Sequence, residues 1–185
     1  MLTETMKAHR LHIGTWWIPL PSTTNAQRTR AVRSLLERQY RSVTYDVAGK
    51  QEDGTRTHQG LTEYHSSNRE SLALYIRLLY GDGIFYSKTE DGMIWLLIIN
   101  DGVIVPGTDC LLNPLVFDSL MEDRKFSQYK TLSVKELSED CEKDILVHYE
   151  ASQLRLKKRR YFFYAILAFL GLVLLAIPTT FILMG

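Results

Sequence analysis

The sequence predicts an α/β domain with a mixed sheet, followed by one C-terminal transmembrane helix. Three observations support this fold class. Residues 84–105 contain three short apolar runs separated by Asp-Gly turn sequences at residues 90–92 and 100–102, which is typical of a β-meander. Segments with apolar residues at helical spacing lie on both sides of it in the chain. Finally, residues 161–185 contain no charged residue and no histidine.

The middle run of the meander, residues 94–99, is apolar on both of its faces, which predicts a central strand with helices or another sheet on both sides. Asn113-Pro114 predicts the start of a helix through Met121, because proline suits the first helical turn. Residues 145–149 fit either a closing strand, which we prefer, or the start of a helix that continues from Ala151 into the membrane. The other elements are expected as strands over residues 11–20, 43–47 and 61–65, a loop over residues 49–60, and helices over residues 26–41, 68–80 and 133–141.

Residues 161–183 are expected to form the transmembrane helix. The uncharged run of twenty-five residues would extend roughly 37 Å as a helix, and a bilayer hydrocarbon core is about 30 Å thick. The alternative is a buried core helix, but such helices usually keep a polar stripe. Here apolar side chains point to all sides of the helix.

A basic segment, residues 155–160, stands immediately before this run and predicts the orientation of the anchor. Basic residues remain on the cytoplasmic side, so residues 1–154 are expected to form one cytoplasmic domain. Residues 1–10 lack the apolar core of a secretory signal, and the two cysteines agree with a reducing compartment. The membrane-orienting residues are Arg155, Lys157, Lys158, Arg159 and Arg160.

No known arrangement of catalytic residues is recognisable. The sequence lacks a phosphate-binding loop, a dinucleotide fingerprint, zinc-ligand spacing and a serine nucleophile motif, and its histidines are scattered singly. We therefore expect no catalytic, cofactor or metal site, and a protein that is not an enzyme. The alternative is a tail-anchored hydrolase or nucleotide-binding enzyme that uses Asp82 and Asp109 as paired carboxylates, although aspartates in turns more often stabilise the turn.

Two charged surfaces are candidates for partner binding. Arginines at helical spacing would form one face of the first helix, which suits an acidic protein or anionic headgroups; interleaved aromatics, which would mark a nucleic-acid surface, are absent. Acidic residues gather between residues 136 and 144 and could meet a basic partner. For both surfaces the alternative is an ordinary solvated face. The candidate residues are Arg30, Arg33, Arg38 and Arg41 on the first surface, and Glu136, Glu139 and Asp140 on the second.

Three segments of the chain carry a resemblance to a known family. They are Leu78-Leu79-Tyr80-Gly81-Asp82-Gly83-Ile84-Phe85, Asp91-Gly92-Met93-Ile94-Trp95-Leu96-Leu97 and Asp101-Gly102-Val103-Ile104-Val105-Pro106-Gly107-Thr108-Asp109. The sequence resembles the PilO-type pilin accessory proteins of type IVb pili, a family that includes the bundle-forming pilus protein C. These proteins are in turn similar to the platform protein L of type II secretion. The resemblance covers roughly residues 11–180.

The resemblance implies a non-enzymatic scaffold in the bacterial inner membrane with a single span. Its cytoplasmic domain would have an actin-like or ribonuclease-H-like core and would dock the cytoplasmic assembly ATPase. The chain would also contact a polytopic inner-membrane platform protein and form part of an oligomeric complex. Members of the family continue into a periplasmic region after the span, whereas this sequence ends at Gly185.

Overall fold

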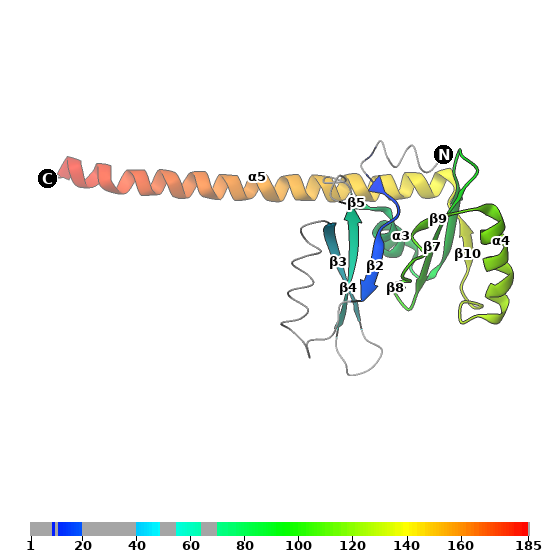
Figure 1. Ribbon diagram of the computed structural model, residues 1–185. Helices are drawn as coiled ribbons and strands as arrows, with labels where there is room; N and C mark the ends of the chain where they lie inside the picture. Colours follow the sequence, from blue (N-terminus) through cyan, green and yellow to red (C-terminus); the bar gives the residue numbers. More distant parts are fainter. Residues whose placement is uncertain (1–8, 10, 20–39, 49–54, 64–69, 185) are drawn as a thin grey trace. The chain divides into compact units, whose positions relative to one another are not determined.

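The computed structural model describes residues 9, 11–19, 40–48, 55–63 and 70–184 (Figure 1). The chain divides into two compact units, residues 1–145 and 146–185. The first unit is a mixed α/β structure, which confirms the α/β part of the predicted fold class. The second unit is helical. The domain boundary expected after residue 154 stays a prediction.

The first unit combines short strands with a few helices. The strands are β1 (Leu11–His12), β2 (Trp16–Pro19), β3 (Tyr40–Ala48), β4 (Thr55–Glu63), β5 (Glu70–Ser71), β6 (Gly83–Lys88), β7 (Ile94–Asn100), β8 (Val103–Ile104), β9 (Cys110–Leu112) and β10 (Val134–Glu136). The helices are α3 (Leu72–Tyr80), α4 (Pro114–Asp123) and a 3-10 turn over Arg124–Phe126; α5 (Glu139–Met184) begins in this unit and continues through the second.

The largest sheet has the strand order β10-β6-β7-β8, with β9 also paired to β7. Strand β7 pairs antiparallel with both β6 and β8, its neighbours in the chain, so the predicted meander is confirmed. Strands β7 and β8 are joined by a tight two-residue turn. Asp101 and Gly102 have the positive φ values that such a hairpin turn requires, 53° and 71°. Strand β10 pairs parallel to β6, which makes the sheet mixed.

Strand β7 is buried on both faces, as its sequence predicts. On one face, Leu96 and Ile98 belong to an apolar cluster that includes Phe117 of α4. On the other face, Trp95, Leu97 and Ile99 are fully buried. This strand is therefore the centre of the apolar core.

Helix α4 covers the first of these faces, and its start is set by local sequence. The Asn113 side chain accepts a hydrogen bond from the Leu115 backbone N–H at 2.9 Å, and Pro114 occupies the first helical position. The ring of Phe117 then lies 5.0 Å from the ring of Tyr86 on β6. The predicted helix start is confirmed, and the helix ends at Asp123, just beyond the predicted Met121.

A second sheet has the order β2-β4-β3 and is antiparallel. Gly60 on β4 lies opposite Trp17 on β2, and a Cβ atom at residue 60 would lie only 2.5 Å from the Trp17 ring. The buried indole therefore requires glycine at this position. Strands β1 and β5 form a separate parallel pair.

Two predicted elements near residue 140 are wrong. Residues 133–141 were expected as one helix, but residues 134–136 form β10 and α5 begins only at Glu139. Ile84 N–H donates to the Ser133 carbonyl at 2.8 Å and Leu137 N–H donates to the Tyr86 carbonyl at 2.9 Å, so the edge of β6 binds this segment as a strand. Residues 145–149 are helical in α5, which is the alternative and not the preferred strand.

Two boundaries near the second sheet also differ from the prediction. Residues 55–60, expected as part of a loop, belong to β4. Residues 40 and 41, expected at the end of a helix, begin β3. The full pairing of β3 with β4, from Tyr40↔Glu63 to Ala48↔Thr55, accounts for both shifts, because a long hairpin satisfies the backbone groups of both segments. Most of the predicted helix over residues 26–41 lies outside the described residues.

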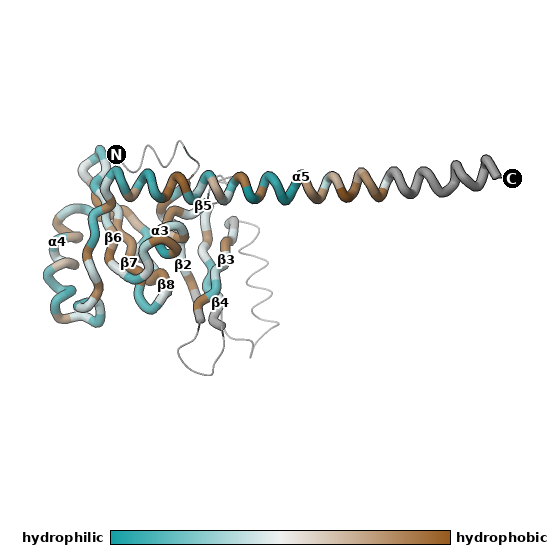
Figure 2. The backbone as a smooth tube through the Cα atoms, turned by 180° about the vertical axis from the view of Figure 1, so that it is seen from behind, coloured by the Kyte–Doolittle hydropathy of each residue, from teal (hydrophilic) through white to brown (hydrophobic). Residues whose placement is uncertain are grey.

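The second unit consists of α5 from Leu146 onward, in agreement with the helix expected from Ala151. Figure 2 shows the hydropathy of α5 change from teal in the basic segment to brown after it. Within the described part of the chain, no helix combines the length and the apolar character that a membrane span needs. About half of the predicted span over residues 161–183 falls on residues 172–183, whose side chains lie outside that part.

The central position of β7 predicts a large difference between two leucine-to-alanine substitutions. Leu96 is 2% exposed, whereas Leu115 on α4 is 79% exposed. Leu96→Ala should lower the free energy of unfolding by about 2–5 kcal/mol, because it leaves a cavity in the core. Leu115→Ala, the matched control, should change it by less than about 0.5 kcal/mol. Urea unfolding followed by tryptophan fluorescence measures both values, and equal effects would contradict the assigned core.

Candidate functional site

The carboxylate of Asp109 is buried in the first unit, where it is 4% exposed. Its Oδ1 accepts hydrogen bonds from the Gly14 backbone N–H at 2.8 Å and the Trp95 indole N–H at 3.0 Å. Its Oδ2 accepts from the Thr15 backbone N–H at 3.1 Å and the Trp17 indole N–H at 3.2 Å. Each oxygen therefore has two N–H donors.

The strand pairing explains how these groups meet. Asp109 directly precedes β9, and Leu111 of β9 lies opposite Trp95 of β7, which places the carboxylate beside the Trp95 indole. Gly14 and Thr15 form the connection from β1 to β2, and Trp17 is the second residue of β2. One carboxylate therefore links the second sheet to the core strand of the first.

Burial and hydrogen bonding act in opposite directions on this group. Loss of hydration raises the pKa of Asp109 above its ordinary value, and the donors Gly14, Trp95, Thr15 and Trp17 offset part of this rise. All four neighbours are donors, so the side chain serves as an acceptor. With both oxygens already engaged, the arrangement suits a structural carboxylate and not a general base.

Asp82 was the second carboxylate of the predicted catalytic pair, and it also binds backbone. Its two oxygens accept from the N–H groups of Asp101 at 2.9 Å and Gly102 at 2.7 Å, in the turn between β7 and β8. In the described part of the chain, Asp82 and Asp109 have no hydrogen-bond partner in common. The two carboxylates are therefore engaged by separate sets of N–H groups.

A third polar connection involves Arg77 of α3, which the sequence analysis did not single out. Its Nε donates to the Gly102 carbonyl at 2.6 Å, and a terminal nitrogen donates to the Asp46 carbonyl at 3.0 Å. The guanidinium also lies 4.5 Å from the ring centre of Tyr45, whose hydroxyl accepts from the Ile104 N–H. The available signal was that Arg77 is the sole charged residue of an otherwise apolar helix.

The predicted arginine surface falls mostly outside the described residues. Arg30, Arg33 and Arg38 are not among them. Arg41 belongs to β3, so its expected place on a helix with the other arginines is wrong; its side chain is not described. The cause is the pairing of β3 with β4, which already includes Arg41 opposite Thr62.

The predicted acidic surface is described in full, but it comes from two elements. Glu136 is exposed on β10 and accepts a hydrogen bond from the Tyr86 hydroxyl at 3.3 Å. Glu139 and Asp140 are exposed in the first turn of α5, and Asp140 pairs with Lys143 at 3.3 Å. Acidic residues stabilise a helix N-terminus, so these two carboxylates have a local role as well.

A thiol and a phenol lie together near the start of α5. Burial acts to raise the pKa of Cys141, but hydrogen bonds from Ser138 and Tyr80, with the charge of Lys135, outweigh it and lower that pKa. The pKa of Tyr80 is raised, mainly by burial and by its bond to Cys141. Lys135 Nζ also lies 4.0 Å from the ring centre of Tyr80. The Cys141 side chain is only 5% exposed, which restricts access to this cluster.

Two of the described histidines, His12 and His58, take part in packing and hydrogen bonding. His12 Nε2 lies 3.0 Å from the Thr15 hydroxyl, and the ring of His58 stacks on Tyr45. In the ranges that the structure describes, no three His, Cys, Asp or Glu side chains are grouped so that they could hold a metal ion.

The basic segment lies on α5 in the second unit. Its residues Arg155, Lys157, Lys158, Arg159 and Arg160 are all exposed. The aromatic residues that follow are exposed too, with Tyr161 at 73% and Tyr164 at 64%. This unit thus presents a band of positive charge followed by a band of aromatic and aliphatic side chains.

Comparison with known proteins finds no matching family and no similar curated protein.

The four bonds of Asp109 predict unequal effects of two substitutions. Asp109→Ala leaves four N–H donors without an acceptor and should lower the free energy of unfolding by about 3–5 kcal/mol. Asp109→Asn keeps the shape and one oxygen, so its loss should be smaller, about 2 kcal/mol. Denaturant unfolding of the full chain measures both. Cys110→Ala is the control at the neighbouring residue, and an alanine variant as stable as wild type would contradict the role given to Asp109.

The raised pKa of Asp109 also predicts a pH dependence. The unfolded chain loses this proton near pH 4, at about 3.9, and the folded state loses it at a higher pH. Between these two pKa values the folded state binds more protons, so the contribution of Asp109 to stability falls as the pH rises. The difference in unfolding free energy between wild type and Asp109→Asn should therefore shrink from pH 4 upward. A difference that grows with pH would mean that folding lowers the pKa of Asp109, contrary to the assigned direction.

Proposed function

We propose that this chain is a non-enzymatic scaffold of a type IV pilus or related secretion machine, anchored in the bacterial inner membrane by a single helix. Its first unit would be cytoplasmic, with an actin-like or ribonuclease-H-like core. It would dock the assembly ATPase and couple it to the polytopic platform protein. The observation that carries the proposal is the order of the parts: a mixed α/β unit that contains the meander of the family resemblance, then a basic segment, then an apolar run.

The use of polar groups inside the first unit supports a scaffold over the alternative, a tail-anchored enzyme. That enzyme would need Asp82 and Asp109 as free carboxylates. Asp82 instead binds two turn N–H groups, and Asp109 binds four N–H groups in the interior. These contacts favour a domain whose polar side chains hold its own strands in place.

The exposed acidic residues are the docking surface that the described residues support best. Glu136 at β10 and Glu139 and Asp140 at the first turn of α5 are close in sequence and exposed. Complementary charge accelerates encounter and selects partners, so a basic surface on the ATPase is the expected counterpart. The arginines Arg30, Arg33 and Arg38, which lie outside the described residues, remain the second candidate, for an acidic partner.

Charge reversal tests the acidic docking surface. Glu139→Lys/Asp140→Lys should weaken binding to the purified assembly ATPase of the same pilus system by about tenfold, because it replaces attraction with repulsion. Glu90→Lys/Asp91→Lys is the matched control, since both residues are exposed in the turn between β6 and β7. Biolayer interferometry with the full chain in neutral detergent measures the affinities.

Equal weakening by both double variants would exclude the acidic surface, and Arg30→Glu/Arg33→Glu/Arg38→Glu then tests the arginine surface. An ATPase that does not bind the wild-type chain at all would overturn the proposed scaffold. Calorimetric titration of the same chain with ATP addresses the alternative, because a saturable isotherm would favour the enzyme.

A further inference from the structure

Within the second unit, a basic stretch of α5 at residues 155–160 is followed directly by an aromatic stretch at residues 161–164. Five of the six residues 155–160 are basic, and the chain contains no Asp or Glu after Glu150. In the described part of the chain, neither Arg159 nor Arg160 has a carboxylate partner. Exposed aromatic side chains follow at once. The positive charge is therefore available to a ligand from outside the chain.

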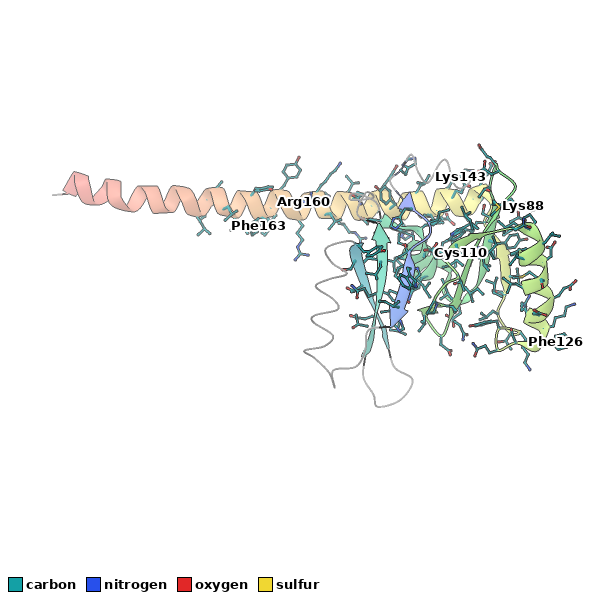
Figure 3. The ribbon with its side chains drawn as sticks, viewed as in Figure 1. Lys88, Cys110, Phe126, Lys143, Arg160 and Phe163 are labelled. Carbon is teal, nitrogen blue, oxygen red and sulfur yellow. The ribbon has the colours of Figure 1, made fainter. Side chains whose placement is uncertain are left out.

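Helical geometry places part of this charge on one face. Leu156, Arg159, Arg160, Phe163 and Tyr164 follow the spacing i, i+3, i+4, i+7 and i+8, and together they line an open groove of ≈ 390 Å³. Figure 3 labels Arg160 and Phe163, which belong to the same stretch of α5. Lys158 is two residues from Arg160, about 200° around the helix, and so lies on the other side.

The groove combines two chemistries in a fixed order along the helix. Guanidinium groups bind phosphate oxygens through paired hydrogen bonds, and they do so better than ammonium groups. Tyrosine is favoured at the boundary between headgroups and acyl chains, where its ring is buried and its hydroxyl stays hydrated. From Arg160 to Tyr164 the helix rises about 6 Å, which separates the phosphate-binding end from the aromatic end.

We propose that this face of α5 is a binding site for an anionic phospholipid of the cytoplasmic leaflet, in which Arg159 and Arg160 bind the headgroup phosphate. Phe163 and Tyr164 contact the glycerol backbone and the first acyl carbons. The inference rests on the proposed membrane anchor and adds a lipid preference to it. A free phosphate ion would use the two arginines alone, whereas a lipid also uses the aromatic half of the groove.

The test measures single lipids bound to the full chain in neutral detergent micelles by native mass spectrometry. The probes are phosphatidylglycerol and phosphatidylcholine of equal acyl length. Wild type should bind phosphatidylglycerol about tenfold more tightly, because the choline ammonium of phosphatidylcholine offsets the phosphate charge that the two arginines attract. Arg160→Gln should remove most of this preference. Lys158→Gln, which removes the same charge from the other side of the helix, should change it by less than about twofold.

Several outcomes would overturn the lipid site. Equal affinity of wild type for the two lipids would do so, and so would equal losses in Arg160→Gln and Lys158→Gln, which would indicate total charge and not a face. Displacement of phosphatidylglycerol by inorganic phosphate at constant ionic strength would assign the arginines to free phosphate. Unchanged lipid affinity in a Tyr164→Ala variant would show that the aromatic half of the groove does not contribute to lipid binding.

The same preparation separates this inference from the proposed function. If alkaline carbonate extracts the chain from membranes without detergent, both the proposed anchor and the proposed lipid site are wrong. If the chain requires detergent but binds both lipids equally, only the lipid site is wrong. Binding of the assembly ATPase is measured independently and does not depend on either result.

Discussion

The carboxylate of Asp109 is the interaction on which the first unit depends most. A buried carboxylate without partners costs several kcal/mol, of order 3–5 when one partner is removed, and a buried N–H group without an acceptor is also unfavourable. Neither side of this network can therefore be removed alone. Because Trp17 and Trp95 donate to the same side chain, β2 and β7 have a fixed relation. The close approach of Gly60 to the Trp17 ring comes from the antiparallel pairing of β2 with β4.

The other polar contacts inside the first unit serve the same purpose. Asp82 holds the turn after β7, Arg77 joins that turn to β3, and the Tyr45 hydroxyl accepts from β8. Each of these side chains forms hydrogen bonds with backbone N–H or C=O groups, which need such partners when they are buried. These side chains thus hold turns and strands together, whether they are buried like Tyr45 or exposed like Asp82.

The sequence predicted the elements that local chemistry determines. The meander depends on the Asp101-Gly102 turn, and α4 on the Asn113 cap, and both signals lie within a few residues of the element they set. Strand β10 was missed because Val134, Leu137 and Cys141 have helical spacing, while its pairing with Ile84 and Phe85 is non-local. The candidate site shows the same limit. Asp109 was recognised as notable, but the donors that define its role come mostly from 92 to 95 residues away.

That separation has a consequence for biosynthesis. The ribosome synthesises Gly14, Thr15 and Trp17 long before Asp109. The Trp17 indole N–H therefore lacks its acceptor during most of the translation of the domain. Strand β6 likewise waits for β10. Contacts between distant residues slow folding and prolong the exposure of apolar side chains. The nascent first unit therefore stays incomplete until Ile145 is synthesised, shortly before the apolar run that begins at Tyr161.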